Sequence, residues 1–129
     1  MAAERERRMV PRTTLAEWPA ARVRGVRAVH LLDLSLTGAQ IEHLDLVRLG
    51  APCALELPPP FGALSLRAEV VWCTVIGRQH RLGGASRLVV RSGLRFIRLT
   101  GAQHTTLADT LRHLAATRHP GVNSQQRSA

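Results

Sequence analysis

The strongest constraint on what this chain can fold into is a run of alternating side chains between Leu64 and Trp72. Apolar residues occupy one parity of the run and mostly polar residues the other, beginning with Leu64, Ser65 and Leu66. Because successive side chains of a strand point to opposite faces, this alternation predicts a strand with one buried face. Trp72 shares the apolar parity with Val70, so we expect its ring in the core.

Four shorter stretches have a similar character and fill much of the chain before residue 100. They cover residues 24–32, 39–43, 53–57 and 88–99, with turn-forming segments at 34–38, 58–62 and 77–84. Short strands at this spacing are typical of all-β domains. The pattern therefore predicts five or six short strands in a small antiparallel barrel or sandwich.

A helix is predicted after the strands, starting at Thr106. Thr106 and Asp109 have the spacing of a capping box, and Pro120 with Gly121 should end the helix after about three turns. Its apolar face repeats at i, i+4 and i+7, with Leu107, Leu111 and Leu114.

These elements divide the chain into three parts. Residues 1–12 are charged and lack apolar periodicity, so we expect a flexible N-terminal arm. Residues 13–118 form the predicted domain of barrel and helix. Residues 119–129 have little to bury, which predicts a disordered tail. A length of 129 residues suits one domain.

The chain is strongly basic. Eighteen basic residues, all of them arginine, stand against nine acidic residues, which gives a net charge of +9. Such a charge predicts an anionic partner. Aromatic residues make up 3% of the chain, which leaves few rings for stacking on the bases of a nucleic acid. Nucleic acid is therefore a less favoured partner.

Cysteine usage and hydropathy bear on the compartment. Cys53 and Cys73 form no CxxC pair, and we expect both as buried thiols in a reducing environment. The N-terminus lacks the apolar region of a signal peptide, and the apolar runs are too short to span a bilayer. These features predict a cytoplasmic protein without membrane insertion.

Sequence patterns of catalysis are absent. The six histidines form no HExxH or HxxxH motif and no Cys/His cluster, no serine lies in a GxSxG turn, and the glycines of GxGxxG and the P-loop are missing. We expect no metal, no cofactor and no enzymatic activity. An anion must then be held by side chains, and the guanidinium group of arginine binds phosphate or guanine in bidentate fashion.

Two short motifs remain. Arg8 and Arg12 form an RxxxR pair, but about 2.4 such pairs are expected by chance from this composition, and the chain has three. Asp33, Ser35 and Gly38 form DxSxxG between two predicted strands, with a chance expectation of about 0.014. A structural explanation is that the Asp and Ser side chains bond nearby backbone amides while Gly38 takes a positive φ. That explanation leaves the upstream arginine pair unexplained.

The order of these features resembles the PilZ domain family of bacterial cyclic di-GMP receptors. RxxxR precedes the strands, DxSxxG follows an early strand, and AEVVW, SGLRFIRL and a closing helix come later. The resemblance extends from Arg7 to about Leu114. It implies a mainly β fold, a small six-stranded antiparallel barrel with a C-terminal α-helix. The connection GRQHRLGGASR departs from the family pattern.

The resemblance also implies a cyclic di-GMP site made of Arg8, Arg12, Asp33, Ser35 and Gly38, with Arg7 as a third phosphate contact. Arginines can bind guanine or phosphate, a carboxylate can accept from guanine N1–H and N2–H, and a glycine lets the ligand approach the backbone. Binding would order the arm and signal to an unidentified effector protein. Two alternatives stay open: a basic nucleic-acid-binding barrel, and a PilZ-like adaptor that binds no nucleotide.

Three further arginines share one parity of the last predicted strand: Arg87, Arg91 and Arg95. Their neighbours Leu88 and Val90 take the apolar parity. We expect the arginines on the outer face of the strand, as solvated side chains rather than as a second binding surface.

Overall fold

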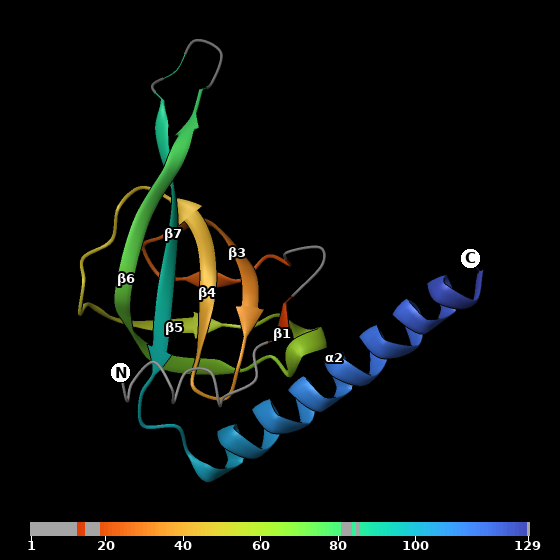
Figure 1. The fold of residues 1–129 in the computed structure, drawn as a ribbon. Helices are drawn as coiled ribbons and strands as arrows, with labels where there is room; N and C mark the ends of the chain where they lie inside the picture. Colours follow the sequence, from red (N-terminus) through yellow and green to blue (C-terminus); the bar gives the residue numbers. More distant parts are fainter. Residues whose placement is uncertain (1–12, 15–18, 81–83, 85, 129) are drawn as a thin grey trace, which may run out of the picture.

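The computed structural model describes residues 13–14, 19–80, 84 and 86–128. In these residues the elements follow one another as strands β1 to β7, a short 3₁₀ helix η1 before β6, and the helix α2 (Figure 1). Their bounds are β1 Thr13–Thr14, β2 Arg22–Val23, β3 Arg27–Leu34, β4 Gly38–Leu44, β5 Pro52–Glu56, η1 Pro59–Phe61, β6 Ser65–Gln79, β7 Arg87–Phe96 and α2 Gly101–Ser128.

The strands curl into a barrel. All pairs are antiparallel, in the order β1-β3-β4-β7-β6-β5-β2. The β2 end of this sheet meets β3, because a bridge joins Ala20 to His30 and the Ala21 N–H donates to the Val29 carbonyl at 3.0 Å. β2 to β7 thus form a six-stranded, nearly closed barrel, and β1 adds a two-residue pairing at the end of β3. The predicted fold class is confirmed.

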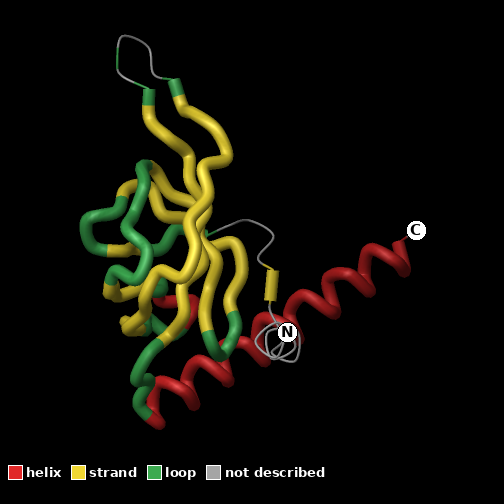
Figure 2. Tube along the Cα trace, turned by 60° about the vertical axis from the view of Figure 1, so that its left-hand side comes forward, coloured by secondary structure: helices red, strands yellow, loops and turns green. Residues whose placement is uncertain are grey.

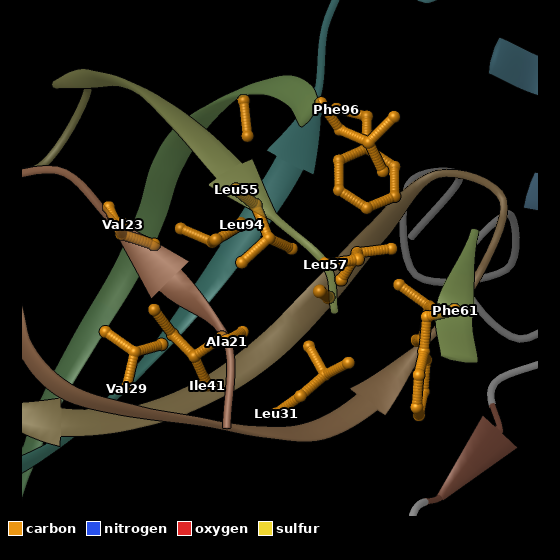
Figure 3. Packing of buried hydrophobic residues seen from close by; sticks show 14 of the residues in the cluster. Ala21, Val23, Val29, Leu31, Ile41, Leu55, Leu57, Phe61, Leu94 and Phe96 are labelled. Atoms are coloured by element: carbon orange, nitrogen blue, oxygen red, sulfur yellow. The ribbon is translucent and has the colours of Figure 1, made fainter. Parts of the chain in front are cut away.

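Alternating side chains of the strands fill the barrel. Leu31 of β3, Leu55 of β5 and Leu66 of β6 are fully buried, and Figure 3 shows Leu31 and Leu55 among the packed side chains of the interior. Phe61 of η1 and Leu107 of α2 belong to the same cluster. Each large apolar side chain buried here contributes roughly 1.5–3 kcal/mol, so the ends of β3 and β4 stand on a rigid frame.

Helix α2 begins at Gly101, five residues before the predicted start at Thr106. Thr100 and Gln103 form its capping box: the Gln103 N–H donates to Thr100 Oγ1 and the Thr100 N–H donates to Gln103 Oε1, both at 3.1 Å. These bonds satisfy backbone donors that the start of a helix leaves open. Because glycine is usually unfavourable within a helix, Gly101 makes this start difficult to predict from the sequence.

The apolar face predicted for this helix is confirmed, since Leu107 is fully buried and Leu111 and Leu114 pack against the core. The predicted end at Pro120 and Gly121 is wrong, because α2 continues to Ser128. A proline inside a helix removes one backbone hydrogen bond and can kink the helix without ending it. The division into arm, domain and tail otherwise stays a prediction.

Strands β6 and β7 extend beyond the barrel. The sequence predicts a strand that ends near Trp72, whereas β6 continues to Gln79. Its pairing with β7 shifts register between Val70 and Trp72 and again between Val75 and Gly77. Such bulges add one residue to a strand, redirect the side chains that follow and increase the twist. We call residues 71–79 of β6 and their partners 87–93 of β7 the ribbon (Figures 1 and 2). At its base, residues 89–93 of β7 still pair with β4, and only the part beyond them projects from the barrel.

Candidate ligand-binding site

The turn between β3 and β4 is built around the hydroxyl group of Ser35. The Gly38 N–H donates to Ser35 Oγ at 3.1 Å and the Thr37 N–H at 3.2 Å. The hydroxyl donates in turn to the Gly38 carbonyl at 3.2 Å, and the Ser35 N–H donates to the same carbonyl at 2.9 Å. Ser35 is fully buried. Its side chain is thus engaged in shaping the turn.

Gly38 is required by its neighbour in the sheet. A Cβ at this position would lie 2.1 Å from the carbonyl oxygen of Leu94 in β7. The positive φ expected for Gly38 is wrong, since the described glycines with positive φ are Gly25, Gly50 and Gly62. The close approach of two backbones, rather than a left-handed conformation, therefore explains this glycine.

Asp33 lies at the end of β3, where a register shift follows Leu31. Its Oδ1 accepts a hydrogen bond from the Gln40 N–H at 3.0 Å, and the residue is 9% exposed. A carboxylate offers about four acceptor positions, and this bond uses one of them. The bulge and this bond hold the Asp33 side chain at the β3–β4 hairpin.

The N-terminal segment joins the fold at this same place. β1 pairs with the end of β3, Thr13 opposite Leu34 and Thr14 opposite Asp33. The predicted site residues Arg7, Arg8 and Arg12 lie outside the described residues, so their contribution stays a prediction.

Trp72 lies on the same row across the sheet. Cα partners lead from Asp33 to Gln40, from Gln40 to Gly93, and from Gly93 to Trp72. A Cβ on Gly93 would lie 2.0 Å from Trp72 Nε1, so the indole rests on the bare backbone of β7. Gly93 belongs to the outward parity of β7. The predicted core position of Trp72 is wrong, because the bulge after Val70 turns it to the outer face.

A sequence signal for this arrangement was available. An isolated glycine inside a strand pattern indicates a bulge or a close approach of another group, and Gly93 is such a residue. The signal does not say which side chain approaches, because the partner lies twenty-one positions away and its register depends on the bulge.

A family model described as the PilZ domain matches residues 4–113. The chain belongs to the PilZ domain family. Among solved structures, this PilZ domain is similar to one described as the PilZ domain with c-di-GMP of YcgR from Escherichia coli, with a TM-score of 0.65. The two are 14% identical, and the match covers 91% of this chain and 98% of that chain. At this identity the likeness shows a shared fold. No curated protein matches the chain.

The outer face of this PilZ domain carries the three arginines of β7 as predicted. Arg91 Nε donates to Glu42 of β4 at 3.1 Å, and Arg87 Nη1 donates to Asp45 at 2.8 Å. Arg95 pairs with Glu69 of β6. Exposed ion pairs of this kind contribute at most about 1 kcal/mol each. Arg91 and Arg95 lie two positions to either side of Gly93, the residue on which Trp72 packs.

A cavity of the PilZ domain lies away from the motif. This cavity of about 660 Å³ is lined by residues 20–26, 28–30 and Glu56, around the connection between β2 and β3. Its lining includes none of the residues 33–38 and mixes the basic Arg22 and Arg24 with an acid. We therefore locate the candidate site at the β3–β4 hairpin rather than in this cavity.

Other chemistry of the PilZ domain is limited. In the described ranges no three His, Cys, Asp or Glu residues gather as possible metal ligands, and no helix is long and apolar enough to cross a membrane. Cys53 and Cys73 are free thiols and are half-buried rather than buried as predicted. Burial raises the pKa of the Cys53 thiol, which lowers its reactivity.

Proposed function

We propose that this PilZ domain is a non-catalytic receptor for cyclic di-GMP, and that binding orders residues 1–12 and passes the signal to a protein partner. The observation that carries the proposal is the position of β1. It begins directly after Arg12 and pairs with Leu34 and Asp33. The segment that follows RxxxR therefore lies beside the DxSxxG turn. The solved PilZ domain of YcgR, described with c-di-GMP, supports the same ligand class.

Each group has a chemical task in this site. Arg8 and Arg12 bind the N7/O6 edge of guanine or a phosphate in bidentate fashion, and Arg7 adds a phosphate contact. Asp33 accepts from guanine N1–H and N2–H. Ser35 and Gly38 act by fixing the turn, since the buried hydroxyl is already bonded there.

Trp72 extends the site beyond the motif residues. Its half-buried indole lies on the outer face, in the row that starts at Asp33, and offers a flat surface on which a guanine can stack. Base–aromatic stacking contributes about 1–3 kcal/mol. Because Trp18 is the other tryptophan, Trp18→Phe leaves Trp72 as the single indole reporter of binding. Cyclic di-GMP should quench its fluorescence, and GTP should do so much less.

Calorimetry with cyclic di-GMP tests the arginines of the arm. A charge-assisted bidentate contact contributes about 1.5–3 kcal/mol, so Arg8→Ala and Arg12→Ala should each weaken binding about tenfold or more. The Tm of the unliganded domain should stay nearly unchanged. Wild-type affinity in either variant would show that this arginine does not bind the ligand. A large fall in the Tm of the unliganded variant would show instead that the arginine stabilises the fold.

Asp33→Ala separates the receptor from a nucleic-acid binder. If charge alone drove association, the variant would bind short DNA or RNA at least as well as the wild type, with a steep salt dependence. A guanine receptor loses about 1–3 kcal/mol of cyclic di-GMP affinity instead, and its wild type binds cyclic di-AMP poorly. Equal affinity for both dinucleotides, with no loss in the variant, would contradict the receptor function. Failure to bind either dinucleotide would favour the adaptor.

Hydrogen exchange tests the ordering of the arm. Amides of residues 1–12 should exchange at least several-fold more slowly when cyclic di-GMP is added to the wild type, because a contact between two parts of the chain protects the segment that closes over the ligand. The Arg12→Ala variant should show no such slowing at the same ligand concentration. If the dinucleotide binds and exchange in residues 1–12 does not change, then the signal does not pass through the arm.

A further inference from the structure

The exposed large apolar side chains of the described residues gather at the ribbon end of the barrel. Val71, Val75 and Ile76 of β6 are 45–47% exposed, and Leu46 and Leu49 of the loop before β5 are 61% and 62% exposed. Apolar side chains grouped on one surface indicate an interaction site, whereas scattered ones are ordinary. Figure 1 shows the ribbon projecting from the barrel beyond this loop.

The loop that holds the two leucines is fastened to the base of the ribbon on both sides. On one side the Asp45 N–H donates to the Leu88 carbonyl of β7 at 2.9 Å. On the other side the Gly50 N–H donates to the Val70 carbonyl of β6 at 2.7 Å. The leucines and the apolar residues of the ribbon therefore belong to one end of the molecule.

Along the ribbon, the outer edge of β6 has no strand partner among the described residues. β5 pairs with β6 as far as Glu69, and Ala51 accepts from the Val70 N–H at 3.2 Å. From Val71 to Gln79, all pairings of β6 within the described residues are with β7. This edge is about 30 Å long at the usual rise of a strand, and its backbone N–H and C=O groups can accept a further strand.

The charge around this edge is positive. Arg48 of the loop and Arg78 of β6 are exposed, and neither residues 46–51 nor residues 70–80 include an Asp or Glu. The carboxylates that flank these segments are paired with arginines of β7. A second copy of the chain, with its charge of +9, is repelled from such a surface, whereas an acidic segment is attracted.

We infer that the edge Val71–Gln79 is a docking site for an extended acidic segment of a partner protein, which adds a strand to the sheet. Backbone hydrogen bonds along β6 hold the segment, and its apolar side chains at alternate positions pack on Val75 and Ile76. Its carboxylates meet Arg48 and Arg78. Trp72 is shared with the proposed cyclic di-GMP site, but the added strand bonds to backbone groups of β6 and the surface does not include the DxSxxG turn, so this docking does not require the dinucleotide.

The test is hydrogen exchange of the full chain with defined peptides. The probe is an eight-residue peptide of alternating glutamate and valine with blocked ends, and its control replaces every glutamate by lysine. The acidic peptide should slow exchange of amides within residues 71–79 at least tenfold, without added dinucleotide. Ile76→Glu should abolish this protection, while Thr105→Glu, the same charge change on exposed α2, should leave it intact. The Tm of both variants should match that of the wild type.

Several outcomes would overturn the inference. Absence of protection with the acidic peptide would show that the edge of β6 does not accept this strand. Equal protection with the lysine peptide would show that the charge of the partner does not matter. Protection that rises with protein concentration without peptide would assign the edge to a second copy of the chain. Protection by phosphatidylglycerol vesicles but not by the peptide would assign it to a membrane surface. Each of these results is independent of whether calorimetry detects cyclic di-GMP binding.

Discussion

Two hairpins at opposite ends of the barrel have the same antiparallel pairing but differ in how much of their surface is exposed (Figure 1). The hairpin of β3 and β4 has a tight turn in which the Ser35 hydroxyl is fully buried and bonded. The hairpin of β6 and β7 leaves the barrel and exposes Val75, Ile76 and a strand edge. A precise small-molecule site needs side chains held by a rigid frame, whereas docking of another chain needs accessible backbone and apolar surface.

Matched glycine substitutions should show the largest contrast between the two hairpins. In Gly38→Ala the new Cβ meets the Leu94 carbonyl, a backbone atom that cannot move away without disturbing β7, so the free energy of unfolding should fall by about 2–3 kcal/mol. In Gly77→Ala the new Cβ meets nothing within 4 Å, and the change should stay within about 0.5 kcal/mol. Urea unfolding measures both. Similar losses of unfolding free energy in Gly38→Ala and Gly77→Ala would contradict the difference expected between the two hairpins.

Matched serine substitutions should show a smaller contrast. Ser35→Ala leaves the buried Gly38 N–H without its acceptor and removes the acceptor of the more exposed Thr37 N–H, which should cost about 1–2 kcal/mol. Ser86→Ala removes an exposed hydroxyl that accepts from Arg78, and should cost less than about 0.5 kcal/mol. If thermal unfolding gives equal Tm values for both variants, then the hydroxyl of Ser35 does not stabilise the turn.

A buried histidine near the base of the ribbon predicts a pH effect. His43 pairs with Val90, and its Nε2 lies 2.7 Å from Ser92 Oγ. Burial lowers the pKa of His43 below its ordinary value of 6.5, and this outweighs the backbone hydrogen bonds with Leu44 and Asp45 and the nearby carboxylates of Asp45 and Glu42, all of which raise it.

Because the unfolded chain then binds this proton more readily, the free energy of unfolding is highest above pH 6.5 and falls as the pH decreases through that value. The loss cannot exceed about 1.4 kcal/mol per pH unit for one proton. Urea unfolding between pH 8 and pH 5 should show this loss in the wild type and a smaller one in His43→Gln. Parallel curves would mean that His43 is protonated equally in both states.

The sequence predicts the local part of this structure well and the non-local part poorly. Alternation locates the strands, and DxSxxG identifies an unusual turn between β3 and β4. The reason for Gly38 is hidden, because the carbonyl that excludes a side chain belongs to Leu94, far along the chain. Trp72 is misplaced for the same reason, since the bulge after Val70 exists only in the pairing with β7.

The start of helix α2 is a further feature that local sequence patterns do not predict. Its apolar face follows from the spacing of Leu107, Leu111 and Leu114, but its start depends on which of two capping boxes forms. Thr100 is selected because α2 must turn back under the barrel directly after β7, and the Gln103 side chain also donates to the Ser65 carbonyl at 3.0 Å. This contact with β6 cannot be predicted from a local pattern.

The brevity of β1 determines how such a receptor would respond to its own abundance. Two residues, Thr13 and Thr14, tie the N-terminal segment to β3, so this pairing opens far more easily than the barrel unfolds. A flexible arm joined directly to β1, as the sequence predicts, would have an effective concentration at the turn in roughly the millimolar range. A dinucleotide bound by both RxxxR and DxSxxG would bridge two parts of the same chain. The concentration of dinucleotide at which half of the receptor is occupied would then not depend on how many copies of the protein are present.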